Sequence, residues 1–249
     1  MAKRNLRLWL MFDGANYHGW QSQKNAVAIA DVVTSALSRL TGEEIKLYGC
    51  SRTDAGVHAM NYCASFVTES SIPAQRFPYA LNFLLPPDIR ATRVEDVDED
   101  FHAQYACIGK EYTYKLHYAQ FDNPFFKDRV YHYRYSSVDA EKMDEAAKHF
   151  IGTHDFKSCM AQGSPVKSTV RTIKYFDVTS KGERVNFTVY ADGFLYNMVR
   201  IMVGTLLEVG KGKLSPESID DILLSKDRTM AGLTVPACGL YLTKVDYQK

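Results

Sequence analysis

Strand-like and helix-like hydrophobic patterns alternate in a fixed order through the first half of this chain, and that order limits the possible folds more than any other feature. Gly42 follows the first helical pattern and Pro86 follows the second, and both residue types favour helix ends. The order β-α-β-β-α-β predicts a ferredoxin-like unit. Strands are expected at residues 7–12, 45–50, 59–66 and 89–97, and helices at 29–40 and 74–85.

The second half repeats the same logic with insertions. Tyr112 and Tyr114 begin an alternation of apolar and polar residues that is typical of a half-buried strand. We therefore predict an α+β protein whose two ferredoxin-like halves share a mostly antiparallel sheet, with a boundary near Gln104 that gives domains 1–104 and 105–249. Further strands are expected at 130–135, 171–178, 184–190 and 240–245, and helices from near Ser137 to Gly152, at 195–209 and from Ser215 onward.

The charge of the chain does not by itself indicate a nucleic-acid-binding protein, because the formal net charge is only +1. Its distribution is less even: residues 88–100 carry six acidic side chains against two arginines, whereas residues 162–213 carry eight basic side chains against four acidic ones. This asymmetry fits a molecule with one basic face, and it fits an ordinary solvated surface equally well.

Cysteine usage and the N-terminal residues bear on the cellular compartment. The five cysteines form no Cys-x-x-Cys pair, so neither a disulfide framework nor a zinc site is predicted. The apolar run at 8–12 is too short for a signal-peptide core or a membrane span. We expect a cytoplasmic protein.

Residues 51–58, Ser-Arg-Thr-Asp-Ala-Gly-Val-His, place a charge pair, a glycine and a histidine between two strand patterns. A loop between two fixed strands can present the carboxylate of Asp54 rigidly. Taken alone, the Asp-x-Gly sequence also suits a plain hairpin turn beside a surface arginine, Arg52.

Two residues of the second half are further candidates. Arg200 lies within the apolar run 197–203, where an unpaired charge would be very costly, so it needs either a partner or a route to solvent. Tyr112 heads the apolar face of its strand, a position that a core tyrosine also occupies.

The stretch at 51–58 resembles the active-site signature of the tRNA pseudouridine synthase A (TruA) family, whose usual form is Gly-Arg-Thr-Asp-x-Gly-Val-His. Other blocks that resemble the family follow in the same order and extend the resemblance over nearly the whole chain. They are Phe12-Asp13-Gly14 through Gln21, Asp100-Phe101-His102-Ala103, Tyr112-Thr113-Tyr114, Asn197-Met198-Val199-Arg200, and Gly239-Leu240-Tyr241-Leu242.

The resemblance implies an isomerase that converts uridine to pseudouridine in the anticodon stem-loop of tRNA, at positions 38, 39 and 40, without a cofactor. It assigns Asp54 as the nucleophile and Arg200 as its ionic partner, in a cleft between the two halves. It also places Tyr112 against the target uracil and gives Arg52 a part in binding the displaced nucleotide. A homodimer in which one tRNA contacts both subunits is implied as well.

The chain departs from the family pattern at two places. Ser51 replaces the usual glycine, which reduces backbone freedom at one loop position. Cys159-Met160 follow Ser158 where the family often has a phenylalanine and an arginine, so one expected basic contact with RNA is absent.

Two other functions compete with the isomerase. A catalytically silent RNA-binding module is possible because paired ferredoxin-like halves make good RNA platforms, but the presence of Asp54, Arg200 and Tyr112 disfavours it. A hydrolase of a nucleoside or glycoside usually needs two carboxylates, and no second acidic residue stands out near Asp54 in the sequence.

Overall fold

The computed structural model describes residues 3–134, 137–163 and 166–248. The chain divides into two compact units. Unit 1 contains the residues up to 108 together with those from 242 onward, and unit 2 contains residues 109–241. The predicted boundary near Gln104 lies close to this division, while the return of the last residues to unit 1 has no signal in a linear pattern. The two-domain assignment itself stays a prediction.

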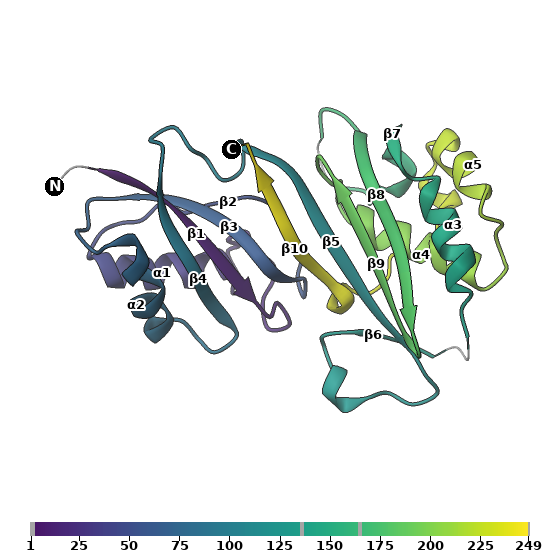
Figure 1. Ribbon diagram of the computed structural model, residues 1–249, viewed down its shortest axis with the longest axis horizontal. Coiled ribbons are helices and arrows are strands. Elements are labelled where there is room, and N and C mark those ends of the chain that lie inside the picture. The colour runs from purple at the N-terminus through teal and green to yellow at the C-terminus, as the bar shows by residue number, and fades with distance from the viewer. Residues whose placement is uncertain (1–2, 135–136, 164–165, 249) are drawn as a thin grey trace. The chain divides into compact units, whose positions relative to one another are not determined.

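Unit 1 is an antiparallel sheet with two helices (Figure 1). Its strand order is β4-β1-β3-β2, as expected for a ferredoxin-like unit, and the end of β10 lies next to β3. The strands are β1 (Arg4–Phe12), β2 (Tyr48–Gly49), β3 (His58–Thr68), β4 (Ile89–Val97) and β10 (Leu240–Tyr247), and the helices are α1 (Ile29–Thr41) and α2 (Phe77–Leu84), the latter preceded by the 3-10 turn η1 (Ala74–Arg76).

The apolar periodicities of unit 1 explain its core. Leu6, Leu8 and Leu10 of β1 point to one side and are fully buried. Helix α1 buries Ile29, Val33, Ala36 and Leu37, a spacing that defines one helical face. It ends at Gly42, whose φ of 75° is left-handed and suits glycine.

Unit 2 repeats the β-α-β-β-α order with two additional short strands and an additional short helix. Its sheet order is β5-β9-β8-β7 with antiparallel neighbours, and β6 runs parallel to β5. The strands are β5 (Cys107–Tyr118), β6 (Tyr131–Tyr133), β7 (Gly152–Asp155), β8 (Val170–Lys181) and β9 (Arg184–Ala191), and the helices are α3 (Ala140–Lys148), α4 (Met198–Gly210) and α5 (Ser218–Ser225), with short 3-10 turns at Pro124–Phe126, Phe156–Cys159, Arg228–Met230 and Ala237–Gly239.

The predicted α+β class with mostly antiparallel strands is confirmed, and most predicted elements form within a few residues of their expected bounds. Helix α4 begins at Met198 and not at 195, because Asn197 has a left-handed backbone with φ of 61°. Nearly every residue of α4 is buried, as its all-round apolar sequence predicts. No helix in the described part of the chain is long and apolar enough to cross a membrane.

Other predicted bounds were wrong. Helix α3 is capped by Asp139, which accepts a hydrogen bond from the Lys142 N–H at 3.0 Å, and not near Ser137. Gly152 does not end that helix but begins β7, a strand that the hydrophobic pattern does not predict. The strand expected at 130–135 is limited to β6, and its predicted end at Tyr135 lies outside the described residues. Helix α5 starts at Ser218, after a turn in which the Ser218 N–H bonds to the Ser215 carbonyl.

Candidate active site

Asp54 begins a tight turn in the connection between β2 and β3. Its carbonyl accepts a hydrogen bond from the Val57 N–H at 3.2 Å, and Gly56, the third residue of the turn, has φ of 78°. A positive φ at that position is characteristic of turns that require glycine. The loop is therefore a defined turn, and its first side chain, Asp54, is partly exposed.

The segment 14–20 holds this turn in place. The Trp20 N–H donates to the Thr53 carbonyl at 3.2 Å, and the Gly56 N–H donates to the Tyr17 carbonyl at 3.2 Å. At Gly19, whose φ is 82°, a Cβ would overlap the carbonyl oxygen of Thr53. The backbones of the two segments therefore approach each other closely. Segment 14–20 holds the Asp54 loop on both sides of the carboxylate.

His58 fastens the other end of the loop. It is 1% exposed, and its Nδ1 accepts the Gly14 N–H at 3.0 Å. The same nitrogen lies 3.0 Å from Oδ1 of Asp13. At Gly14 a Cβ would overlap the Val57 carbonyl. His58 thus holds the C-terminal end of the loop against Asp13 and Gly14.

A pair of stacked rings supports the start of the loop. The rings of Trp20 and Tyr62 stack with centroids 4.1 Å apart, and the Tyr62 hydroxyl donates to the Ser51 carbonyl. Gly49 lies against both rings and has no room for a side chain. The supporting roles of Trp20, Tyr62 and Gly49 were not predicted from the sequence, because a supporting contact leaves no periodic signal. Trp20 does lie in the block from Phe12 to Gln21 that belongs to the resemblance.

The two side chains before Asp54 have opposite environments. Thr53 is buried, and its hydroxyl has no hydrogen-bond partner among the described residues. Arg52 is exposed, and in the described part of the chain its guanidinium makes no hydrogen bond or ion pair. Arg52 can therefore meet an anion from solvent without breaking an existing contact.

Tyr112 and Arg200 belong to unit 2. Tyr112 pairs with Val189 across β5 and β9, is 6% exposed, and meets the ring of Phe194 edge-to-face at 5.2 Å. The predicted alternation of β5 is confirmed, since Tyr114 and Leu116 are buried on the same face. Burial raises the pKa of Tyr114 well above its ordinary value.

Arg200 has two short hydrogen bonds within unit 2. Its Nε donates to the Val235 carbonyl at 2.7 Å, and its Nη1 donates to Oδ1 of Asn197 at 2.7 Å. Two bonds of different direction fix the plane of the guanidinium. Arg200 is thus held in place by its own unit.

The structure brings the predicted residues together in two groups. Arg52 and Asp54 share the loop of unit 1. Tyr112 and Arg200 are linked through one connection, that between β9 and α4, because Phe194 contacts Tyr112 and Asn197 binds Arg200. The ion pair predicted between Asp54 and Arg200 stays a prediction.

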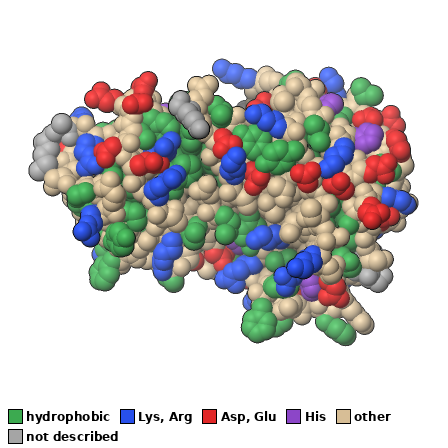
Figure 2. Space-filling view, viewed as in Figure 1, with side chains coloured by type: hydrophobic (Ala, Val, Ile, Leu, Met, Phe, Trp, Pro, Cys, Tyr) green, Lys and Arg blue, Asp and Glu red, His purple; other side chains and the backbone are tan. Residues whose placement is uncertain are grey.

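The face of the molecule seen in Figure 2 does not carry one sign of charge. Figure 2 shows Lys and Arg side chains interspersed with Asp and Glu over the face in view. One hollow of about 350 Å³ in unit 1 combines cations with rings, since the Arg7 guanidinium lies 5.7 Å from the Trp9 ring and 5.6 Å from that of Tyr247.

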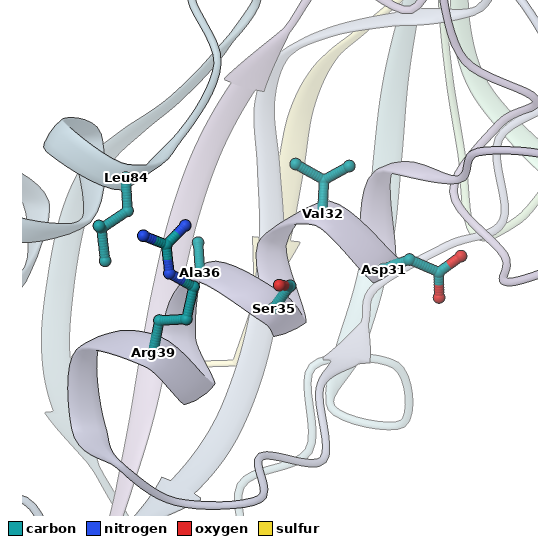
Figure 3. A pocket seen from close by; sticks show the side chains of 6 residues that line it. All are labelled: Asp31, Val32, Ser35, Ala36, Arg39 and Leu84. Atoms are coloured by element: carbon teal, nitrogen blue, oxygen red, sulfur yellow. The ribbon is translucent and has the colours of Figure 1, made fainter.

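A second hollow of about 350 Å³ lies along α1. Figure 3 shows Asp31 at one end of it, and Arg39 close to Leu84 at the other. It contains none of the four predicted site residues, and its carboxylate and guanidinium lie far apart in the view. We therefore place the candidate active site at the Asp54 loop.

Comparison with known proteins decides the family. A family model described as tRNA pseudouridine synthase matches residues 9–106 and 146–248. The chain belongs to the tRNA pseudouridine synthase family. As a member of that family, it is an isomerase. The family match includes Arg52, Asp54 and Arg200, whereas Tyr112 lies in the stretch between the matched segments.

Relatives of the same family cover nearly the full chain. A protein of Acetivibrio thermocellus named tRNA pseudouridine synthase A is 48% identical over 244 residues, which cover 98% of this chain and 100% of the relative. One of Thermoanaerobacter pseudethanolicus with the same name is 46% identical with the same coverage. Among solved structures, an archaeal box H/ACA sRNP Nop10-Cbf5 complex aligns with 81% of this chain and 44% of its own, at 15% identity and a TM-score of 0.38.

Proposed function

We propose that this protein isomerises uridine to pseudouridine in the anticodon stem-loop of tRNA, at positions 38, 39 and 40, with Asp54 as the nucleophile and without a cofactor. The observation that carries the proposal is the rigid turn that presents a partly exposed Asp54 within the segment matched by the family model. The names of the relatives support tRNA as the substrate.

The reaction needs one nucleophile and no redox partner. The Asp54 carboxylate attacks either the ribose C1′ or C6 of the uracil ring, and the bond between N1 and C1′ breaks. The base turns, C5 forms a new bond to C1′, and the bond between Asp54 and the carbon that it attacked breaks, which regenerates the carboxylate. The hydrogen on C5 leaves to solvent and N1 gains a proton, so atoms and electrons balance. Since no group is transferred to or from another molecule, no cofactor is required.

The neighbouring residues have distinct proposed roles. Arg52, exposed and on the same loop as Asp54, would bind a backbone phosphate or the nucleotide displaced when the target base turns out of the stack. Tyr112 would pack against the uracil. Arg200 would pair with the Asp54 carboxylate, and its two bonds within unit 2 would give that pair a defined geometry.

The remaining parts of the proposal concern partners and compartment. We propose a homodimer in which one tRNA contacts both subunits, and a cytoplasmic location in keeping with a tRNA substrate. Both follow from the family resemblance of the sequence.

Tritium release from tRNA labelled at C5 of uridine tests the proposed function. The isomerase releases tritium into water in proportion to the pseudouridine formed. A silent RNA-binding module would bind the tRNA without release, and a hydrolase would liberate free uracil with its tritium retained. Either of the last two results would contradict the proposal.

A further inference from the structure

Asn197 occupies an unusual position at the start of α4. It is the residue before the first helical turn, where an asparagine side chain commonly accepts a hydrogen bond from a backbone N–H of that turn. Here its side chain makes no such capping bond, and its backbone is left-handed with φ of 61°. A left-handed conformation is uncommon outside glycine, and asparagine is among the residues that tolerate it best.

The side chain of Asn197 is used for a different contact. Its Oδ1 accepts the Nη1 of Arg200 at 2.7 Å. Asn197 therefore has an unfavourable backbone conformation and does not cap the helix. Its side chain instead orients the Arg200 guanidinium. Backbone strain of this kind is commonly found at functional sites.

The second acceptor for Arg200 is itself firmly held. Val235, whose carbonyl accepts the Arg200 Nε, lies in a segment that is anchored at both ends. The Gly232 N–H donates to Oγ1 of Thr205 on α4 at 2.9 Å, and the Tyr114 hydroxyl donates to the Pro236 carbonyl at 2.8 Å. The Val235 carbonyl is thus a fixed point, and Asn197 supplies the second point that defines the guanidinium plane.

We propose that Asn197 is a positioning residue, which acts through Arg200 and not on the substrate. This inference rests on the proposed function, because it assigns Asn197 a part in the same site. With Oδ1 removed, the Arg200 guanidinium would keep only one of its two bonds to unit 2, that at Nε, and its plane would be less tightly defined. A misoriented cation would then align Asp54 less well during the chemical step.

Asn197→Gly is the sharpest test, because glycine accepts the left-handed backbone without strain and lacks only the side chain. We expect kcat for pseudouridine formation to fall about tenfold, which is about 1.4 kcal/mol, while KM for tRNA stays within about threefold. The melting temperature should change little, because relief of the left-handed backbone strain offsets the lost hydrogen bond to Arg200. Asp128→Gly is the matched control: Asp128 is a second non-glycine residue of unit 2 with positive φ, at 59°, and its replacement should leave kcat unchanged.

A double-mutant cycle separates positioning from a general structural effect. Arg200→Lys keeps a positive charge but lacks the planar group that Asn197 orients, so adding Asn197→Gly to it should change kcat less than about twofold. Wild-type kcat in Asn197→Gly, or a full tenfold loss in the Arg200→Lys background, would overturn the positioning role and leave the proposed function standing. Absence of pseudouridine with the wild-type protein would instead overturn the proposed function itself.

Discussion

At the scale of single residues, Arg200 shows how a cation is accommodated in an apolar helix. The sequence predicts that Arg200 needs a partner, because the surrounding run 197–203 is apolar. The structure provides the Val235 carbonyl and the Asn197 side chain within the same unit. The first of these lies 35 residues away along the chain and is a backbone group, so no residue pattern could have indicated it.

Replacing Arg200 by methionine should affect both stability and activity. The Val235 carbonyl and Oδ1 of Asn197 would each lose a hydrogen bond, and we expect the free energy of unfolding to fall by about 1–3 kcal/mol. Activity should be lost if Arg200 pairs with Asp54. Urea unfolding and tritium release on the same variant measure the two effects. A destabilised but fully active Arg200→Met protein would remove Arg200 from the site.

Glu95 gives a prediction for the dependence of stability on pH. Its carboxylate accepts bonds from Arg7 and Trp9, both at 2.8 Å. Burial alone would raise the Glu95 pKa, but the Arg7 and Trp9 hydrogen bonds outweigh burial and lower the pKa below 4.5. A lowered pKa in the folded state stabilises the protein above pH 4.5, and this stabilisation is lost as the pH falls through the folded-state pKa.

The free energies of unfolding of the wild-type protein and Glu95→Gln, measured in urea at pH 7 and pH 3, check this. The wild-type protein should be the more stable at pH 7, and the difference should shrink at pH 3. An equal difference at both pH values would mean that Glu95 contributes through packing alone.

At the scale of elements, the Asp54 loop depends on a segment far from it in sequence. The pattern of residues 51–58 predicts a turn between two strands, and the turn from Asp54 to Val57 has that form. The clasp formed by Gly14, Gly19 and Trp20 was not predicted, since it consists of backbone hydrogen bonds and close approach. Glycines in a sequence show where close contact is possible, not what is contacted.

Gly19→Ala tests the importance of this clasp. A Cβ at residue 19 would overlap the Thr53 carbonyl and sit on a left-handed backbone, so we expect a loss of about 2–4 kcal/mol in the free energy of unfolding. Gly182→Ala is the control, because Gly182 also has positive φ, at 58°, but nothing lies within 4 Å of the added Cβ. Its cost should be only about 1 kcal/mol. Similar losses in the free energy of unfolding of the two variants, measured in urea, would show that the clasp rearranges at little energetic cost.

At the scale of the whole molecule, local patterns predicted the order of the elements and the ferredoxin-like strand order of unit 1. They did not predict β7 or the membership of the last residues in unit 1, because both depend on contacts between distant parts of the chain. For the site, the sequence located Asp54 in its turn and Arg200 in its helix. The role of Asn197 required the backbone conformation.

The charge of the whole molecule leads to a prediction about RNA binding. With a formal net charge of only +1, affinity for tRNA must come from local cations such as Arg52 and the basic residues between Lys167 and Lys213. A plot of log affinity against log salt concentration should slope downward, and Arg52→Ala should reduce the slope by about 0.7–0.9. Arg39→Ala, on α1, should leave the slope unchanged. A flat plot for the wild-type protein would contradict this source of affinity.

The measurement that tests the central claim most directly is pseudouridine formation by Asp54→Asn with enzyme in excess over tRNA, alongside the Kd for the same tRNA. The amide keeps the shape of the side chain but is not a nucleophile. We predict pseudouridine with the wild-type protein, none with Asp54→Asn, and Kd values within about tenfold of each other, or about 1.4 kcal/mol. Pseudouridine formed by Asp54→Asn under these single-turnover conditions would contradict the assignment of Asp54 as the nucleophile.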